Sequence, residues 1–396
     1  MKVLISAYAC EPGRGSEQGV GWNWSLAAAT RHDVWVMTRA HTREAIERAL
    51  SACDTSIPTF IYLELPWLRR WAVREQGLRH YVYYTLWQFR AALESRRLQR
   101  VHRFDVVHHL TYASIWLPNL AWISGAKFLL GPAGGGPCIP VRLYAVLGTR
   151  GATRELVRLA AQIACRFNPL VRVGWRRAAV ILVQNEESFQ ALPRRYRCRA
   201  EIMPNASVPD ELRGLRVPQR GRRTAVSASR LLPWKGLSLA VRALEDAPGW
   251  QLVIIGHGPE GDRLRRLVDR RGLRERVRFM PWTEQSELWR FLSSADALVL
   301  PSLRDDAPLV AAEALVLGLP VVAFDQGGPA VFARAPGARV VLVPLGSESE
   351  CVHGLAEALN GLANNGSIDD SPSVDFGIGQ VAERLDAVYR TVVAAG

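Results

Sequence analysis

The 396-residue chain has few of the features that mark secreted, metal-binding or membrane-spanning proteins. Its six cysteines are scattered, with no CxxC pair and no cysteine–histidine cluster, so we expect reduced thiols rather than disulfides or a zinc site. No apolar run approaches the roughly 18 residues of a membrane span, and the first ten residues resemble a buried strand more than a signal peptide. No DxD motif offers a carboxylate pair for a divalent metal. We therefore expect a cytoplasmic protein without a metal cofactor.

Acidic residues are scarce in the first half of the chain. Residues 1–221 hold 31 Lys and Arg against 16 Asp and Glu, whereas residues 222–396 hold 19 against 21. Two runs, 67–100 and 142–177, contain eight arginines each. The first run also has an apolar stripe at helical spacing beside arginines and tryptophans: Leu78, Val82, Leu86, Phe89 and Leu93; Arg74, Arg79, Arg90 and Arg97; Trp67, Trp71 and Trp87. This pattern suits a helix on an anionic membrane surface, but core packing or a compositional bias would also produce it.

Short apolar runs alternate with helix-like segments along the whole chain, which predicts parallel sheets covered by helices. Strands are expected at 2–10, 33–38, 58–65, 104–110, 126–130 and 178–183, and again at 224–229, 251–255, 277–279, 297–300 and 320–324. Between the two groups, residues 204–223 are rich in Pro, Gly and Arg and resemble a linker. The fold class is therefore α/β, with two doubly wound, Rossmann-like domains facing a cleft.

Two acids, Asp305 and Glu313, lie in a predicted strand–loop–helix–strand unit at 301–328. Asp305 is in the loop at the strand's carboxyl end, and Glu313 is on the following helix. Ligands of open α/β sheets bind at the carboxyl ends of the strands. We expect these acids to bind a polar, hydroxyl-rich ligand.

Two cations, Arg230 and Lys235, follow the first predicted strand of the second domain in the stretch SRLLPWKG. Gly236 then starts a helix. Guanidinium and ammonium groups neutralise phosphate charge, and a helix N-terminus adds N–H donors. The pair therefore predicts a diphosphate ligand, although basic residues beside a glycine are often only surface residues.

Other strand ends carry weaker signals. Gly13 and Gly15 lie in a loop that could cradle a phosphate, and Gly256 begins a glycine-rich loop suited to backbone contacts with a base or ribose. His108 and His109 end a buried strand and are candidate polar contacts or proton carriers. Side chains alternate along a strand, so at most one of the two histidines should face a cleft.

The ordered motifs SRLLPWKG, VIIGHGPEGDRL, RVRFMPW and LPSLRDDAPLVAAEALVLGLPVVAFDQGGPAV resemble the C-terminal domain of the retaining glycosyltransferases of family 4. Asp305 and Glu313 match that family's pair of glutamates separated by seven residues, with Asp replacing the first Glu. The glycine-rich first loop, the DVVHH strand, MPN at 203–205 and the final helix extend the resemblance over nearly the whole chain.

The resemblance implies the GT-B fold and a particular set of domain boundaries. An acceptor-binding domain would span 1–203, a linker 204–223 and a nucleotide-sugar donor domain 224–375, and a helix in 376–396 would return to the first domain.

The resemblance also implies roles for particular residues. Arg230 and Lys235 would bind the donor diphosphate, Glu313 the ribose hydroxyls and Asp305 the transferred sugar. His108 or His109 would contact that sugar near the anomeric carbon; the family separates its two histidines by one residue, and here they are adjacent, so both remain candidates. The other implied donor contacts are Gly13, Gly15, Asp306, Leu309 and Val310.

The predicted function is a retaining, metal-independent hexosyltransferase-type reaction from a nucleoside-diphosphate-sugar to an acceptor hydroxyl. The predicted acceptor is a lipid-linked glycan at the inner face of the cell membrane, as in exopolysaccharide or cell-surface glycan biosynthesis. A soluble natural-product acceptor and a nucleotide-sugar epimerase are the alternatives. Nucleic acid is not an expected partner, because no recognition module is visible.

Overall fold

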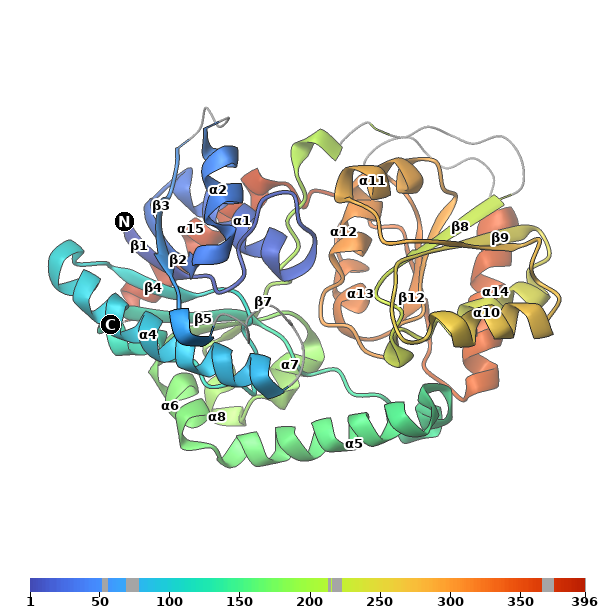
Figure 1. Ribbon diagram of the computed structural model, residues 1–396, viewed down its shortest axis with the longest axis horizontal. Coiled ribbons are helices and arrows are strands. Elements are labelled where there is room, and N and C mark those ends of the chain that lie inside the picture. The colour runs from blue at the N-terminus through green and yellow to red at the C-terminus, as the bar shows by residue number, and fades with distance from the viewer. Residues whose placement is uncertain (52–55, 69–77, 213–214, 216–222, 365–373, 396) are drawn as a thin grey trace. The chain divides into compact units, whose positions relative to one another are not determined.

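The computed structural model describes residues 1–51, 56–68, 78–212, 215, 223–364 and 374–395. It divides into two compact units (Figure 1). Unit 1 comprises Met1–Gly136, Ala161–Ser207 and Gly377–Gly396, and unit 2 comprises Pro137–Ala160 and Val208–Phe376. Among the helices that the structure describes, none is long and apolar enough to cross a bilayer.

Unit 1 is built on a parallel sheet of seven strands among its described residues, in the order β3-β2-β1-β4-β5-β6-β7. The strands are β1 (Lys2–Ser6), β2 (Asp33–Arg39), β3 (Thr59–Leu63), β4 (Val106–His109), β5 (Lys127–Ala133), β6 (Ala178–Val183) and β7 (Ala200–Ile202). The central strands are largely apolar because helices cover both faces of the sheet.

Helices α1 (Ser16–Ala29) and α15 (Ile378–Ala394) pack on one face of this sheet, and α4 (Leu78–His102) and α6 (Pro169–Arg177) pack on the other (Figure 1). The other α-helices among the described residues of unit 1 are α2 (Arg43–Leu50), α7 (Glu186–Ala191), α8 (Arg194–Arg197) and the C-terminal part of α5 (Tyr144–Phe167). The predicted return of the final helix to the first domain is confirmed, because α15 buries Leu385, Val388 and Tyr389 in the core of unit 1.

Unit 2 has a second parallel sheet, with six strands among its described residues in the order β10-β9-β8-β11-β12-β13. Its strands are β8 (Arg223–Ala228), β9 (Trp250–Ile255), β10 (Val277–Met280), β11 (Ala297–Leu300), β12 (Val321–Phe324) and β13 (Val340–Val343). The part of this unit that the structure describes contains α9 (Leu237–Ala243), α10 (Gly261–Arg270), α11 (Gln285–Ser293), α12 (Leu309–Val316), α13 (Gly327–Phe332) and α14 (Glu348–Asn364), together with the N-terminal part of α5.

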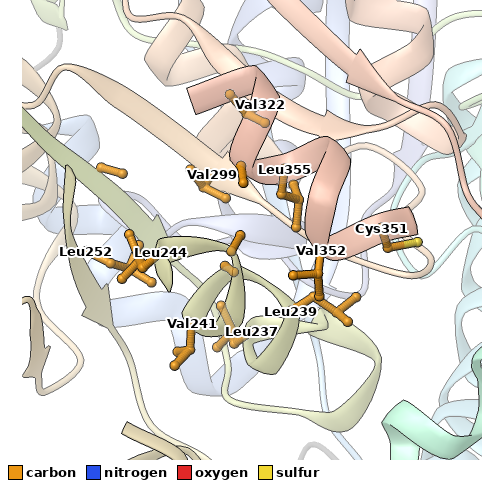
Figure 2. Packing of buried hydrophobic residues seen from close by; sticks show 14 of the residues in the cluster. Leu237, Leu239, Val241, Leu244, Leu252, Val299, Val322, Cys351, Val352 and Leu355 are labelled. Carbon is orange, nitrogen blue, oxygen red and sulfur yellow. The ribbon is translucent and has the colours of Figure 1, made fainter. Parts of the chain in front are cut away.

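The core of unit 2 lies between this sheet and helices α9, α10 and α14. Figure 2 shows side chains of α9 and α14, such as Leu239 and Leu355, gathered against Val299 and Val322 of the central strands. Helix α12 lies on the opposite face, where it contacts β11 and β12 (Figure 1). Because β8 and β11 are neighbours, the loops that follow them emerge side by side at the carboxyl edge of the sheet.

All of the predicted strands are present, within a few residues of their expected ends. Two strands were missed, β7 and β13, and both lie at sheet edges and are short. The predicted first domain, 1–203, differs from unit 1 chiefly in that Pro137–Ala160 groups with unit 2, because Leu143, Val146 and Leu147 are buried in the core of unit 2. Unit 1 also takes in residues 204–207 of the predicted linker, along with the returning C-terminal segment. Much of the predicted linker, residues 213–214 and 216–222, lies outside the described residues.

Candidate functional site

The loop after β8, residues 229–236, carries both predicted cations; we call it the cation loop. Arg230 is exposed, and Lys235 ends a short 3-10 helix, Pro233–Lys235. Gly236 follows with φ +61, and a Cβ there would lie 2.0 Å from the Pro301 carbonyl oxygen. Only glycine fits this position, so the sequence WKG brings the cation loop against the segment that follows β11.

That segment, residues 301–308, carries Asp305; we call it the acid loop. The Leu303 amide donates to the Trp234 carbonyl at 2.8 Å, and the Gly328 amide donates to the Asp305 carbonyl at 3.2 Å. The result is an ion pair between the two loops: Lys235 Nζ is 2.5 Å from Asp305 Oδ2, and the two side chains are 19% and 18% exposed. The structure thus brings together a cation and an acid that are 70 residues apart in sequence.

Glu313 lies on α12 and is buried. Its Oε1 accepts hydrogen bonds from Gln285 Nε2 at 2.5 Å and from Trp289 Nε1 at 3.0 Å. Burial raises the pKa of the Glu313 carboxyl, and the two hydrogen bonds oppose that shift. Gln285 and Trp289 were not predicted, and no motif marks them; they are one helical turn apart on α11, on the side that meets α12.

A second acid, Glu155, was also missed. It is buried on α5, and Arg158 Nε at 3.0 Å and Arg304 Nε at 3.1 Å both donate to its carboxylate. Burial lowers the pKa of Arg304, and neighbouring Arg158 lowers it further. The sequence held one signal for this cluster, because Glu155 is the single acid among the eight arginines of residues 142–177.

The remaining predicted donor contacts of unit 2 lie around these loops. Asp306 is part of the acid loop, and Leu309 and Val310 form the first turn of α12; all three are half-buried. Gly256 has φ +139, and a Cβ there would lie 2.0 Å from the Ser229 carbonyl oxygen, so the loop after β9 packs directly on the cation loop.

In unit 1, Gly13 and Gly15 precede α1. Gly13 has φ +66, and a Cβ on either glycine would meet no described atom within 4 Å. The loop is held from its ends, because the Glu11 amide donates to the Gln18 carbonyl at 3.1 Å and the Tyr112 amide donates to Glu17 Oε2 at 2.9 Å. The role predicted for Gly13 and Gly15 stays a prediction.

The two histidines at the end of β4 point to opposite faces of the sheet, and both are buried. The Gly131 carbonyl can only accept, so His108 Nε2 donates to it at 2.6 Å, and Nδ1 accepts from the Tyr389 hydroxyl at 2.9 Å. Burial lowers the pKa of His108 to about 4. With both ring nitrogens satisfied by unit 1, this geometry fits a structural histidine better than a sugar contact.

His109 faces α4, where Nε2 is 3.3 Å from the Tyr84 hydroxyl. Among the described residues its Nδ1 has no hydrogen-bond partner, although the atom is buried. Burial lowers the pKa of His109 to about 3. Of the two predicted histidines, His109 is therefore the one that retains a polar atom able to take a new partner.

The apolar and aromatic residues singled out in 67–100 fall into an exposed group and a buried one. Val82, Leu86, Phe89 and Leu93 are exposed on α4, with side chains 38–71% accessible, whereas Trp87 is buried in the core. Arg79, Arg90 and Arg97 are exposed on the same helix. Trp71 and Arg74 lie outside the described residues, as do the contacts of the Leu78 side chain. Core packing therefore does not account for the four exposed residues.

A hollow of about 870 Å³ lies in unit 1 at the amino ends of β1 and β2, where Lys2, Asp33 and Asp105 line it. The ligands of parallel sheets bind at the opposite edge, so we do not assign this hollow to the site. In the part of the chain that the structure describes, no three His, Cys, Asp or Glu side chains are grouped so as to hold a metal ion.

Comparison with known proteins connects this chain to glycosyltransferases. Residues 211–364 match the family model described as Glycosyl transferases group 1. The chain is 38% identical over 171 residues to the exopolysaccharide phosphotransferase SCO2592 of Streptomyces coelicolor, covering 41% of this chain and 17% of that protein. It is 36% identical over 104 residues to the lipopolysaccharide core biosynthesis glycosyltransferase LpsD of Rhizobium meliloti, covering 26% of this chain and 30% of that protein. The matches thus span less than a third of either relative.

Among solved structures, the chain is similar to Anabaena HepE (Alr3699), whose crystal structure contains UDP and glucose. The TM-score is 0.57 at 15% identity, and the likeness covers 98% of this chain and 99% of HepE. This likeness, together with the two parallel sheets, confirms the predicted GT-B fold.

Proposed function

We propose that this chain is a retaining, metal-independent glycosyltransferase that moves a sugar from a nucleoside-diphosphate donor to an acceptor hydroxyl. The observation that carries the proposal is the meeting of the cation loop and the acid loop at the carboxyl edge of one parallel sheet, with Lys235 Nζ 2.5 Å from Asp305 Oδ2. The family match over residues 211–364, which contains both loops, and the UDP in the HepE structure support the same assignment.

The chemistry follows from the charges. The bond between the anomeric carbon and the diphosphate breaks with its electron pair going to the diphosphate, a bond to the acceptor oxygen forms, and the hydroxyl proton is released. Arg230 and Lys235 would stabilise the charge that develops on the leaving diphosphate. Asp305 would hold the transferred sugar and Glu313 the ribose hydroxyls. Gln285 and Trp289, which donate to Glu313 Oε1, would keep that carboxylate oriented.

A donor screen tests this function. UDP-, GDP- and dTDP-sugars are offered one at a time, and thermal stabilisation and nucleoside-diphosphate release are measured. We expect one of the nucleotides to give a clear response, and we expect Lys235→Ala and Glu313→Ala to abolish it. Glu357→Ala is the control, because Glu357 is an exposed acid on α14 of the same unit. Normal donor binding and turnover in both site variants would overturn the assignment.

We further propose that the acceptor is a lipid-linked glycan and that α4 rests on an anionic membrane surface. Val82, Leu86, Phe89 and Leu93 form one exposed stripe on α4, and Arg79, Arg90 and Arg97 lie along one side of it. Exposed apolar side chains can enter the lipid interface while arginines bind anionic headgroups, at about 1 kcal/mol per charge. The names of the two relatives, which refer to exopolysaccharide and lipopolysaccharide core, support such an acceptor.

Vesicle sedimentation tests the membrane contact. We expect the protein to bind vesicles containing phosphatidylglycerol, to release them at high salt, and to ignore vesicles of phosphatidylcholine alone. Replacing Leu86 and Phe89 by Gln should reduce binding about tenfold. Val393→Gln is the matched control, because Val393 is an exposed apolar residue on α15, on the opposite face of the sheet. Absence of salt-sensitive binding would favour a soluble natural-product acceptor instead.

A further inference from the structure

Residues Pro137–Ala160 form a segment that we call the arm. The arm lies within the sequence of the first predicted domain, but it is part of unit 2. Four of its apolar side chains are buried in the core of that unit: Ile139, Leu143, Val146 and Leu147. The arm is therefore an integral part of the unit that carries the proposed donor site.

The arm contacts loops at the carboxyl edge of the six-stranded sheet. Arg142 Nε donates to the Gly346 carbonyl at 2.9 Å, just after β13. Arg263, on the helix that follows the β9 loop, donates from Nη1 to the Val146 carbonyl at 3.2 Å. Gly151 approaches the cation loop so closely that a Cβ there would lie 3.1 Å from Pro233 Cβ. This is the edge at which α/β sheets bind their ligands.

The strongest polar tie between the arm and this edge is the pair of Glu155 and Arg304. Glu155 is buried, and its Oε2 lies 3.1 Å from Arg304 Nε. Arg304 also stacks on Trp234, with its Cζ 4.5 Å from the ring centroid. Arg304 directly precedes Asp305, and Trp234 directly precedes Lys235. One guanidinium thus holds the two loops at the residues next to the Lys235–Asp305 pair.

We propose that Glu155 is a positioning residue for the donor site: it holds Arg304, and through Arg304 it fixes the conformation of the acid loop and the placement of Asp305. This inference rests on the proposed function, because it assumes that unit 2 binds a nucleotide-sugar donor. The contact between Glu155 and Arg304 does not depend on any ligand. Glu155 is too deeply buried to touch a donor, so any effect of its replacement on donor binding must pass through Arg304 and the acid loop.

Two variants test the inference, so that one remains informative if the other fails to fold. Arg304→Met removes the tie and leaves Glu155 paired with Arg158, so no buried charge loses its partner. Glu155→Gln removes the negative charge on the arm's side of the tie, so that the ion pair with Arg304 is lost. The control is Glu245→Gln, which breaks an exposed ion pair with Arg271 elsewhere in unit 2. Hydrogen exchange of the peptide covering 301–308 measures how firmly the acid loop is held. Calorimetry measures Kd for UDP and for UDP-glucose, and for the corresponding GDP and dTDP pairs.

We expect both variants to speed exchange of the Leu303 amide, which donates to the Trp234 carbonyl. We also expect Kd for the sugar nucleotide to rise about tenfold while Kd for the nucleoside diphosphate changes less than threefold, because Asp305 is placed against the sugar. A merely structural role would weaken both ligands alike. Loop exchange and ligand Kd values equal to those of the control would overturn the inference. Failure of the wild-type protein to bind any nucleotide sugar, with the loop still loosened in both variants, would overturn the proposed function and leave the arm's hold on the acid loop standing.

Discussion

Replacement of Asp305 by Asn should strengthen the binding of a nucleoside diphosphate while it slows sugar transfer. Lys235 Nζ lies 2.5 Å from Asp305 Oδ2, so a diphosphate that uses this ammonium group must compete with the carboxylate. Asn keeps the size of the side chain and removes its charge. The ammonium group is then available to the diphosphate, but the sugar loses its carboxylate partner.

The size of the effect follows from the geometry of the ion pair. At 2.5 Å, two unit charges attract by about 7 kcal/mol if the effective dielectric constant is about 20, and solvent exposure reduces this upper bound greatly. Fully exposed pairs contribute about 0.2–1 kcal/mol. Lys235 and Asp305 are about four-fifths buried, so we expect about 1–2 kcal/mol, which corresponds to a roughly 5–30-fold lower Kd for the diphosphate.

Titration calorimetry with UDP, GDP and dTDP measures this binding, and release of the diphosphate from the matching sugar donor measures transfer. We expect transfer to fall about 100-fold, which is the usual scale for the loss of one transition-state contact. Asp262→Asn is the matched control, because Asp262 forms an exposed pair with Arg265 in the same unit. Unchanged or weaker diphosphate binding in Asp305→Asn would refute the competition between carboxylate and phosphate.

Three further outcomes are expected. Gly327→Ala should lower the melting temperature and donor affinity together, because a Cβ at this position, with φ +60, would lie 1.9 Å from the Asp305 carbonyl oxygen. Glu313→Gln should abolish any preference for UDP over 2′-deoxy-UDP in calorimetry; a preserved preference would remove Glu313 from the ribose. Burial lowers the pKa of His108 to about 4 and that of His109 to about 3, below the 6.5 of the unfolded chain, so the free energy of unfolding should fall as pH drops from about 6.5 to 4. The slope of the unfolding free energy against pH is up to about 1.4 kcal/mol per pH unit for each histidine. Urea unfolding at several pH values measures this slope, and we expect it to be shallower in His108→Gln than in the wild type.

Much of the fold was predictable from local pattern. Short apolar runs, separated by helix-like segments, predicted the strands of both sheets because a strand buried on both faces is largely apolar. The same pattern put Lys235 and Asp305 in loops at strand ends. It could not find β13 or β7, because a short strand at a sheet edge is only partly buried and its sequence carries a weaker signal.

The sequence by itself determined which residue types stand at which strand ends: cations after one strand, acids after another, and glycines where two backbones approach closely. Only the tertiary structure decided which of them meet. Lys235 pairs with Asp305 because β8 and β11 are neighbours in the sheet. Arg304 meets Glu155 across 149 residues, and His108 meets Tyr389 across 281. Periodicity and turn chemistry act over a few residues, whereas these pairs depend on how distant segments pack, and packing is a property of the whole unit.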